Sequence, residues 1–209
     1  GLRLSAERPE LLDAQLEALS IAAKETGADV RVMAPMVATV EEAAWFARRV
    51  RENGLPKGGV MIEVPAAALR SAHVLAEVEF GSIGTNDLAQ YTMAADRMQG
   101  ELSDLLDPWQ PAVLDVVAAA CEGAASTGRP MGVCGESAGD PLLALVLTGL
   151  GVSSLSMAPS KVPVVRLALS LHSLPECQGI AAAARAAATA REALEAVREL
   201  ARDELTDLL

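Results

Sequence analysis

The chain has 209 residues, of which 51% are apolar and 2% aromatic, and it carries a formal net charge of −11 at pH 7. This length is enough for one domain or two small ones with an aliphatic core, and the acidic balance argues against nucleic acid or an acidic membrane surface as a partner. No apolar run approaches the roughly 18 residues of a membrane span, no signal peptide is visible, and the 3 cysteines lack metal-ligand spacing, so we expect a soluble protein of the reducing cytoplasm.

In the first half of the chain, helical and extended patterns alternate. Pro9 precedes leucines at helical spacing, which predicts a helix that ends at Gly27. Thr39, followed by two glutamates, predicts the capped start of a second helix. The elements expected here are a helix over 9–26, a strand over 30–36, a helix over 39–52, turns at 53–54 and 57–59, a strand over 60–64, a helix from 65, a strand over 80–83 and a helix to 93.

The second half continues the alternation and then changes composition. We expect a helix from 108–111 to 126, a turn over 127–130, a strand over 131–134, a helix over 141–150, a strand over 155–157 and a helix over 161–170. From Leu174 onward the chain is rich in Ala, Arg and Glu and predicts one or two surface-lying helices. This suggests two parts, 1–173 and 174–209. Cys121 and Cys177 are interpreted as packing residues, and His73 and His172 as surface or helix-flanking residues.

The five alternations of strand and helix indicate an α/β fold. Strands that are apolar almost throughout are typical of a parallel sheet covered by helices on the outside. Such units could form an open sheet or part of an eight-unit barrel. The chain has neither a Gly-x-Gly-x-x-Gly after a strand nor a Walker loop, which argues against a nucleotide-binding open sheet. In a barrel, functional side chains gather at the carboxyl ends of the strands.

Polar side chains lie at the ends of three predicted strands, one of which ends at Cys134. Glu63 leaves the strand at 60–64, and Asn86 and Asp87 follow the strand at 80–83. Because these two strands are neighbours in the predicted fold, we expect the two carboxylates to lie close together. Two carboxylates, with ligand oxygens and water, can complete the octahedral shell of Mg²⁺. The alternative is a solvated carboxylate pair at the rim of the fold.

Three further residues have both a structural and a functional interpretation. Asn86 could cap its helix through an Asx turn. Arg97 could pair with a nearby surface carboxylate or bind a phosphoryl group with two hydrogen bonds. Cys134 could be a small buried hydrophobic residue. However, Gly132 and Gly135 leave space beside its thiol. A thiol with an ordinary pKa is mostly protonated at neutral pH and can therefore act as an acid.

The stretch around Asp87 closely resembles a known signature. Ser82 to Leu88, then Gln90-Tyr91-Thr92, then Asp96-Arg97 are similar to the phosphoenolpyruvate-binding barrel of enzyme I, the phosphoenolpyruvate–protein phosphotransferase family of bacterial sugar uptake. Departures occur at Ala89, where relatives usually carry Thr, and at Glu17, where relatives often carry a basic residue. The resemblance extends over nearly the whole chain through residues 33–36, 41–42, 59–67, 132–136 and 155–158.

The resemblance implies a fold and a set of site residues. The fold would be the last five βα units of an eight-unit TIM-type barrel, followed by a helical tail. Glu63 and Asp87 would be the Mg²⁺ ligands, and Cys134 would exchange a proton with the enolate of pyruvate. The substrate-binding residues implied are Asn86, Asp87, Arg97 and Arg3, the last from a short Gly-Leu-Arg match that resembles a turn facing the substrate.

The resemblance also implies a reaction and partners. The phosphoryl group of phosphoenolpyruvate would pass to a protein histidine, releasing pyruvate, in the first step of the sugar phosphotransferase system. The acceptor histidine, the docking region for the histidine-containing phosphocarrier protein and three βα units would lie outside this chain, so we expect the chain alone to be inactive in phosphotransfer. A homodimer is expected. The alternatives are a barrel of the pyruvate phosphate dikinase or phosphoenolpyruvate synthase type, or a non-catalytic dimerisation module.

Overall fold

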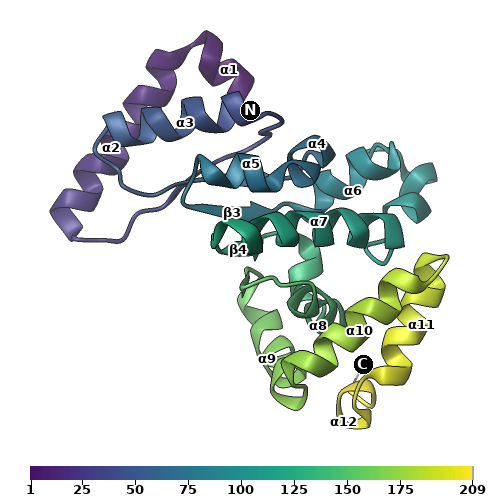
Figure 1. Ribbon diagram of the computed structural model, residues 1–209. Helices are drawn as coiled ribbons and strands as arrows, with labels where there is room; N and C mark the ends of the chain where they lie inside the picture. The colour runs from purple at the N-terminus through teal and green to yellow at the C-terminus, as the bar shows by residue number, and fades with distance from the viewer. Residues whose placement is uncertain (209) are drawn as a thin grey trace.

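Five parallel strands form one sheet in a computed structural model that describes residues 1–208 (Figure 1). Each strand lies beside the strand that precedes it in the chain, in the order β1-β2-β3-β4-β5. This order confirms the α/β class and lacks the reversal that marks a doubly wound sheet. Within residues 1–208, β1 and β5 have a strand partner on one side only. The strands are β1 Val32–Ala34, β2 Gly58–Ile62, β3 Phe80–Ile83, β4 Met131–Val133 and β5 Ser154–Leu155.

Helices connect the strands, and most begin and end close to the predicted positions. In α3, the Thr39 hydroxyl accepts a hydrogen bond from the Glu42 N–H at 3.2 Å, and the Glu42 carboxylate accepts one from the Thr39 N–H at 3.1 Å. This reciprocal cap explains the predicted start. The helices are α1 Leu2–Glu7, α2 Pro9–Thr26, α3 Val40–Glu52, α4 Pro65–Leu69, α5 Ser71–Ala76, α6 Thr85–Met93, α7 Pro111–Thr127, α8 Pro141–Gly149, α9 Val162–Leu171, α10 Leu174–Ala186, α11 Ala190–Leu200 and α12 Asp203–Thr206, with short 3₁₀ helices η1 Gly100–Leu106, η2 Glu136–Gly139 and η3 Pro159–Lys161.

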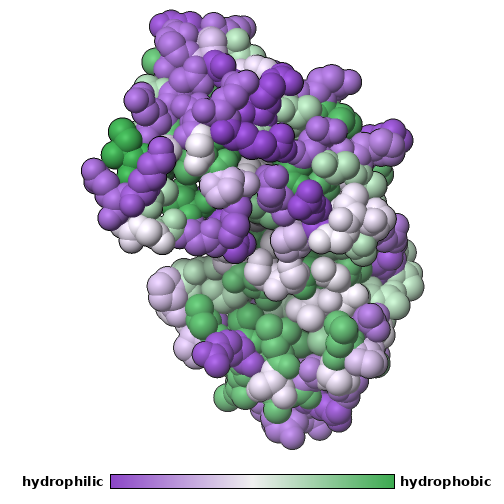
Figure 2. All heavy atoms as spheres, turned by 60° about the vertical axis from the view of Figure 1, so that its left-hand side comes forward, coloured by the Kyte–Doolittle hydropathy of each residue, from purple (hydrophilic) through white to green (hydrophobic). Residues whose placement is uncertain are grey.

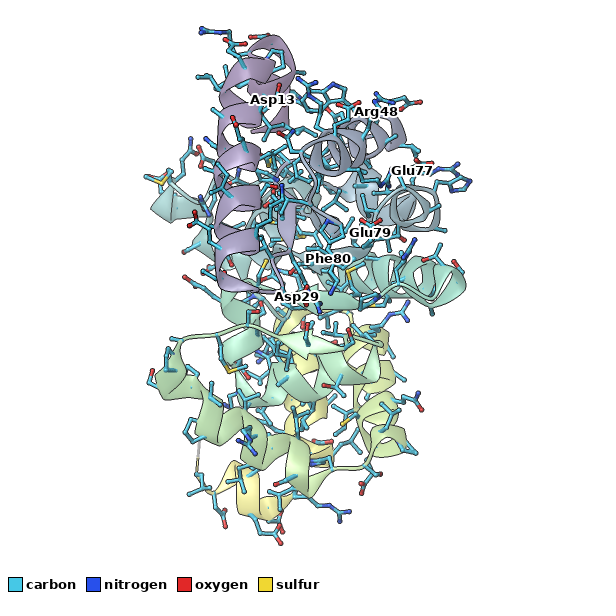
Figure 3. All side chains as sticks on the ribbon, turned by 90° about the vertical axis from the view of Figure 1, so that its left-hand side faces the viewer. Asp13, Asp29, Arg48, Glu77, Glu79 and Phe80 are labelled. Carbon is cyan, nitrogen blue, oxygen red and sulfur yellow. The ribbon has the colours of Figure 1, made fainter. Side chains whose placement is uncertain are left out.

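The turn predicted at residues 57–59 is wrong, because Gly58 and Gly59 begin β2. A side chain on Gly59 would stand 2.4 Å from the ring of Phe80 on the neighbouring strand. The glycine therefore makes room for an aromatic ring across the strand pair. Figure 3 looks at the sheet from the end where its strands begin, and Phe80 lies there with Glu79 and Asp29.

Two hydrophobic cores lie in different parts of the molecule. The first fills the space between the sheet and the helices before β4, and it includes Ile62, Ile83 and Val133, each fully buried. The second lies among the helices after β4, which form the lower half of Figure 1, and includes Leu145 and Val197. The apolar α8 joins this second core to the rest, since its residues are buried from Pro141 to Leu147.

The C-terminal tail differs from the prediction of one or two surface-lying helices. Three helices follow residue 174, and they bury Cys177, Ile180 and Val197 in the second core. The interpretation of His172 as a surface residue is also wrong, although it does flank α9. The residue is 8% exposed, its Nδ1 lies 2.8 Å from the carbonyl oxygen of Ala168, and its Nε2 accepts from the Arg202 N–H at 3.1 Å. The boundary at 173/174 stays a prediction.

The molecular surface is uneven in polarity. In Figure 2 apolar atoms gather on the lower half, where Figure 1 places α8 and α9, and a hollow separates it from a more hydrophilic upper half. A cavity of about 350 Å³ beside β5 is lined by Leu155, Val162 and Leu169 among others. The free edge of β5 is therefore flanked by apolar surface. Within residues 1–208, no helix is both long enough and apolar enough to cross a membrane.

The contact between α8 and α10 gives a first prediction. A side chain on Gly149 would stand 2.1 Å from the carbonyl oxygen of Cys177, a backbone atom that cannot move aside by itself. Gly149→Ala should therefore lower the free energy of unfolding by about 2 kcal/mol, in the range of overpacking. Urea denaturation at equilibrium measures this change.

Gly179→Ala is the matched control, because nothing lies within 4 Å of the added carbon on α10. The higher helix propensity of alanine should stabilise this variant by up to about 1 kcal/mol. Equal unfolding midpoints for the two variants would contradict the close packing of the tail on α8.

Candidate active site

The predicted site residues gather at the carboxyl ends of β2, β3 and β4. The register pairs Ile62 with Ile83 and Ile83 with Val133, so these three strands end level with one another. Glu63 follows β2, Asp87 lies in the first turn of α6 after β3, and Cys134 follows β4. This edge is opposite the end of the sheet that faces the viewer in Figure 3.

Glu63 is a buried carboxylate, 4% exposed. Its Oε1 accepts a hydrogen bond from the Met36 N–H at 2.6 Å, and its Oε2 would be 2.9 Å from a side chain on Gly84. Burial raises the pKa of the Glu63 carboxyl above its usual range; the Met36 N–H lowers it, the negative charge of Asp87 raises it further, and Arg97 lowers it. The buried carboxylate is therefore only partly compensated by the protein.

Asp87 and Arg97 complete this charged cluster. Oδ2 of Asp87 lies 4.0 Å from Nη1 of Arg97, and 54% of the Arg97 side chain is exposed. The Arg97 N–H donates to the side-chain oxygen of Gln90 at 3.1 Å, which ties the loop after α6 back to the helix. Within residues 1–208, Arg97 forms an ion pair with neither Asp96 nor Glu101, the nearby surface carboxylates. Its partner is the predicted metal ligand Asp87.

At the carboxyl ends of β2 and β3, the protein could bind a metal ion through two carboxylates, those of Glu63 and Asp87. Among residues 1–208, no three His, Cys, Asp or Glu side chains group as a ligand set. Glu63 and Asp87 interact electrostatically, and their mutual repulsion leaves negative charge that a divalent cation would neutralise. Mg²⁺ usually binds one or two carboxylates and takes its remaining ligands from substrate and water. The pair fits such an ion, provided that a ligand contributes oxygens.

Asn86 connects two loops at this edge. Its side-chain oxygen lies 3.4 Å from the backbone N–H of Glu136 in η2, and no side-chain cap hydrogen bond is found for α6. The Asx-turn interpretation is therefore not what the geometry favours. Asn86 lines two neighbouring cavities, one with Cys134 and one with Arg97.

Cys134 lines a cavity of about 740 Å³ between the loops after β4 and β5. Cys134 is half-buried, and its Sγ lies 3.6 Å from the carbonyl oxygen of Ile83. The next residue, Gly135, packs so closely on Thr85 that a side chain there would stand 1.8 Å from the Thr85 hydroxyl oxygen. Other residues that line this cavity include Asn86, Glu136, Asp140, Ser156, Met157 and Lys161.

The other cysteines are packing residues, as the sequence predicted. Cys121 and Cys177 are buried in the two cores. Burial raises the pKa of the Cys121 thiol to about 12. Burial also raises the pKa of the Cys177 thiol. Neither residue lines the cavity around Cys134.

The second cavity, of about 380 Å³, contains the Arg97 side chain in its wall. Ala89 also lines this cavity and is 6% exposed. This is the position where the sequence departs from the signature it resembles, and alanine leaves the wall apolar where threonine would add a hydroxyl. The two cavities share Asn86, Glu136 and Asp140.

Arg3 is not brought to these cavities. The turn expected at the start of the chain is wrong, because residues 2–7 form α1. Arg3 lies on that helix, 73% of its side chain is exposed, and its Nε is 3.7 Å from a carboxylate oxygen of Glu42. It lines neither the Cys134 cavity nor the Arg97 cavity. A role for Arg3 in substrate binding stays a prediction.

Sequence reasoning missed two contributors to the site. The Met36 N–H holds Glu63, and Met36 has a positive φ of 58°. Lys161 lines the Cys134 cavity from η3. The Met33-Ala34-Pro35-Met36 match pointed to the first of these, but no local signal distinguished Lys161 from other surface lysines.

Comparison with known proteins places this chain among relatives of one kind. Residues 1–173 match the family described as PEP-utilising enzyme, PEP-binding domain. The chain is 55% identical over 199 residues to a phosphoenolpyruvate-protein phosphotransferase of Streptomyces coelicolor, covering 95% of this chain and 36% of that protein. It is 35% identical over 211 residues to the phosphoenolpyruvate-protein phosphotransferase of Bacillus subtilis, covering 95% and 37%. A multiphosphoryl transfer protein of Xanthomonas campestris is 44% identical over 207 residues, covering 95% and 25%.

The burial of Glu63 gives a prediction about stability. A carboxyl whose pKa is higher in the folded than in the unfolded chain destabilises the fold once the pH rises above its unfolded pKa. In the absence of divalent ions, Glu63→Gln should therefore raise the free energy of unfolding at pH 7, because the neutral amide removes the buried charge and its oxygen can still accept from the Met36 N–H. The gain should vanish as the pH falls below about 4, where both states bind the proton.

Urea denaturation at pH 7 and pH 4, with chelator present, tests this expectation. Glu195→Gln, on an exposed position of α11, is the matched control and should change stability little at either pH. A loss of stability in Glu63→Gln at pH 7 would mean that the protein compensates the buried charge fully.

Proposed function

Because the chain belongs to the family of PEP-utilising enzymes, through their PEP-binding domain, we propose that it is the phosphoenolpyruvate-binding part of a phosphoenolpyruvate–protein phosphotransferase. The observation that supports this proposal is that Glu63, Asp87 and Arg97 interact at the carboxyl ends of β2 and β3, and that the neighbouring strand β4 ends level with them at Cys134. Two carboxylates for a metal ion, a cation for phosphate and a thiol for proton transfer are the groups that the reaction needs. The chain spans about a third of the length of the phosphotransferases it matches.

Each group has one task in the proposed reaction. Glu63 and Asp87 hold Mg²⁺, which when bound supplies positive charge to the oxygens of the substrate. Arg97 neutralises phosphoryl oxygens while the bond between phosphorus and the enol oxygen breaks. The phosphoryl group passes to a protein histidine, and the electrons of the broken bond stay on the enolate. Cys134 then donates its proton to the methylene carbon of this enolate, which yields pyruvate and a thiolate.

The remainder of the barrel and the partners belong to the same proposal. Five sequential parallel strands with free edges at β1 and β5 support an arc of an eight-unit βα barrel. Three further units, the acceptor histidine and the docking region for the histidine-containing phosphocarrier protein would lie outside residues 1–209. The multiphosphoryl transfer protein among the relatives supports this kind of partner. A cytoplasmic homodimer serving sugar uptake completes the proposal.

Ligand binding tests the metal site directly. Calorimetric titration of the chain with phosphoenolpyruvate in the presence of Mg²⁺ should give saturable heat that depends on the metal ion. Asp87→Ala removes one of the two carboxylates and should weaken binding about tenfold or more, the factor that corresponds to roughly 1.4 kcal/mol. Asp29→Ala is the matched control, because Asp29 forms ion pairs at the opposite end of the strands.

Equal affinities of Asp87→Ala and Asp29→Ala for phosphoenolpyruvate would show that Asp87 takes no part in binding. No heat from the unaltered chain at millimolar phosphoenolpyruvate would instead favour a non-catalytic assembly module.

Proton exchange tests the role of Cys134 without a phosphocarrier protein. In D₂O with Mg²⁺ and pyruvate, the thiolate of Cys134 can remove a methyl proton, and the enolate then takes a deuteron back at the same carbon. The proton signal of the pyruvate methyl group should therefore decay in the presence of the chain. Cys134→Ala should slow this decay about a hundredfold, the lower range of general acid–base catalysis.

Cys121→Ala should leave the exchange rate unchanged, because this thiol is buried away from the cavity. Undiminished exchange in Cys134→Ala would assign the proton transfer to another group.

A further inference from the structure

Lys161 occupies a distinctive place in the cavity around Cys134. It is the last residue of η3, directly before α9, and it lines the cavity opposite the loop that carries the thiol. Among the described residues that line this cavity, Lys161 is the one cation. Arg97, the cation nearest to the two carboxylates, lines the neighbouring cavity instead.

The backbone and the first carbons of the Lys161 side chain are held by contacts, whereas its ammonium group has no hydrogen-bond or ion-pair partner among residues 1–208. The Lys161 N–H donates to the carbonyl oxygen of Ala158 at 2.9 Å. Its Cγ and Cβ lie 3.3 Å and 3.5 Å from where a side chain on Gly139 would begin, so the aliphatic stem rests over this glycine. A lysine stem packed in this way keeps its ammonium group near one place while leaving it solvated.

No carboxylate in the described part of the chain neutralises this ammonium group. Lys161 forms no ion pair within 4.0 Å among residues 1–208, whereas Lys57 pairs with Asp29 at 2.7 Å. Two acids share the cavity wall. The Asp140 carboxylate accepts from the N–H groups of Leu142 and Leu143 at 2.8 and 2.9 Å, so its charge is directed to the start of α8. Glu136 is exposed and contributes the one opposing charge that is not engaged in this way.

We propose that Lys161 binds the carboxylate of the three-carbon substrate in the Cys134 cavity, a role that rests on the proposed function. The phosphoryl end has Arg97, and the thiol acts on the methylene carbon. A substrate whose carboxylate bonds to Lys161 would be held between η3 and the loop after β4, with its reacting carbon free to meet Cys134. A charge-assisted hydrogen bond of this kind favours acids over neutral analogues of the same shape.

The test uses the deuterium exchange of pyruvate and of its neutral amide, pyruvamide. Lys161→Met removes the charge and keeps the stem, and it should raise the half-saturating pyruvate concentration about tenfold or more. The maximal exchange rate should change less than threefold, because proton transfer by Cys134 is left in place. Exchange of pyruvamide should be the same in Lys161→Met and the unaltered chain, and Lys161→Arg should restore most of the affinity for pyruvate.

Lys24→Met is the matched control for the lost charge, since Lys24 lies on α2, outside the cavity. Equal half-saturating pyruvate concentrations in Lys161→Met and Lys24→Met would overturn the role of Lys161 and leave the proposed function intact. An equal loss for pyruvate and pyruvamide would also overturn it, because the carboxylate would not be what Lys161 contacts. Absence of exchange in the unaltered chain would remove both the proposed function and this role.

Discussion

The buried carboxylate of Glu63 is the interaction on which the candidate site depends. Taking a charge out of water is unfavourable unless hydrogen bonds or opposite charges replace the solvent. Here the fold supplies one short hydrogen bond from the Met36 N–H and a more distant arginine, and it adds a second acid, Asp87, nearby. This arrangement suits a site in which a bound cation neutralises the two carboxylates. Because burial raises the pKa of the Glu63 carboxyl, the ionised carboxylate costs stability unless a cation binds beside it, as the proposed function requires.

The level ends of β2, β3 and β4 make this arrangement possible. Each loop leaves the sheet at the same height, so side chains that are distant in sequence reach one small region. The helices after β4 support this region, because α8 is buried from Pro141 to Leu147 and packs against α9, α10 and the short helix η2. The tail is therefore part of the support for the loop that carries Cys134, although its composition suggested a surface layer.

Local patterns predicted the elements whose causes are local. The reciprocal cap at Thr39 and the apolar run at 80–83 lie at the positions that the sequence indicated. Gly58 and Gly59 were misread as a turn because the reason for glycine is the Phe80 ring, which lies on another strand. The helix α1 was missed because its preceding residue offers no side-chain cap. The buried state of His172 depends on Arg202, thirty residues later, and no local pattern encodes such a contact.

The candidate site residues could likewise be predicted where the signal is local in sequence, and could not where it depends on distant contacts. Glu63 and Cys134 became candidates because each directly follows a strand, and Asp87 because it lies in the first turn of the helix after one, which are local signals. The contributions of the Met36 N–H and of Lys161 were not predicted. Residues 33–36 match the signature, but the match does not show that the backbone N–H of Met36 binds Glu63, and Lys161 belongs to no motif. Backbone donors and single lysines become recognisable only when the fold shows what they face.

The contact between Gly135 and Thr85 has a consequence for motion. The start of α6 and the loop after β4 lie so close together that no side chain fits at Gly135 beside Thr85, and Asn86 accepts a hydrogen bond from the Glu136 N–H of that loop. Two segments joined this closely must shift as one stiff body. A ligand that displaces the Arg97 loop would thereby also move the sulfur of Cys134. Ligand affinity at Arg97 and the reactivity of the thiol would therefore change together.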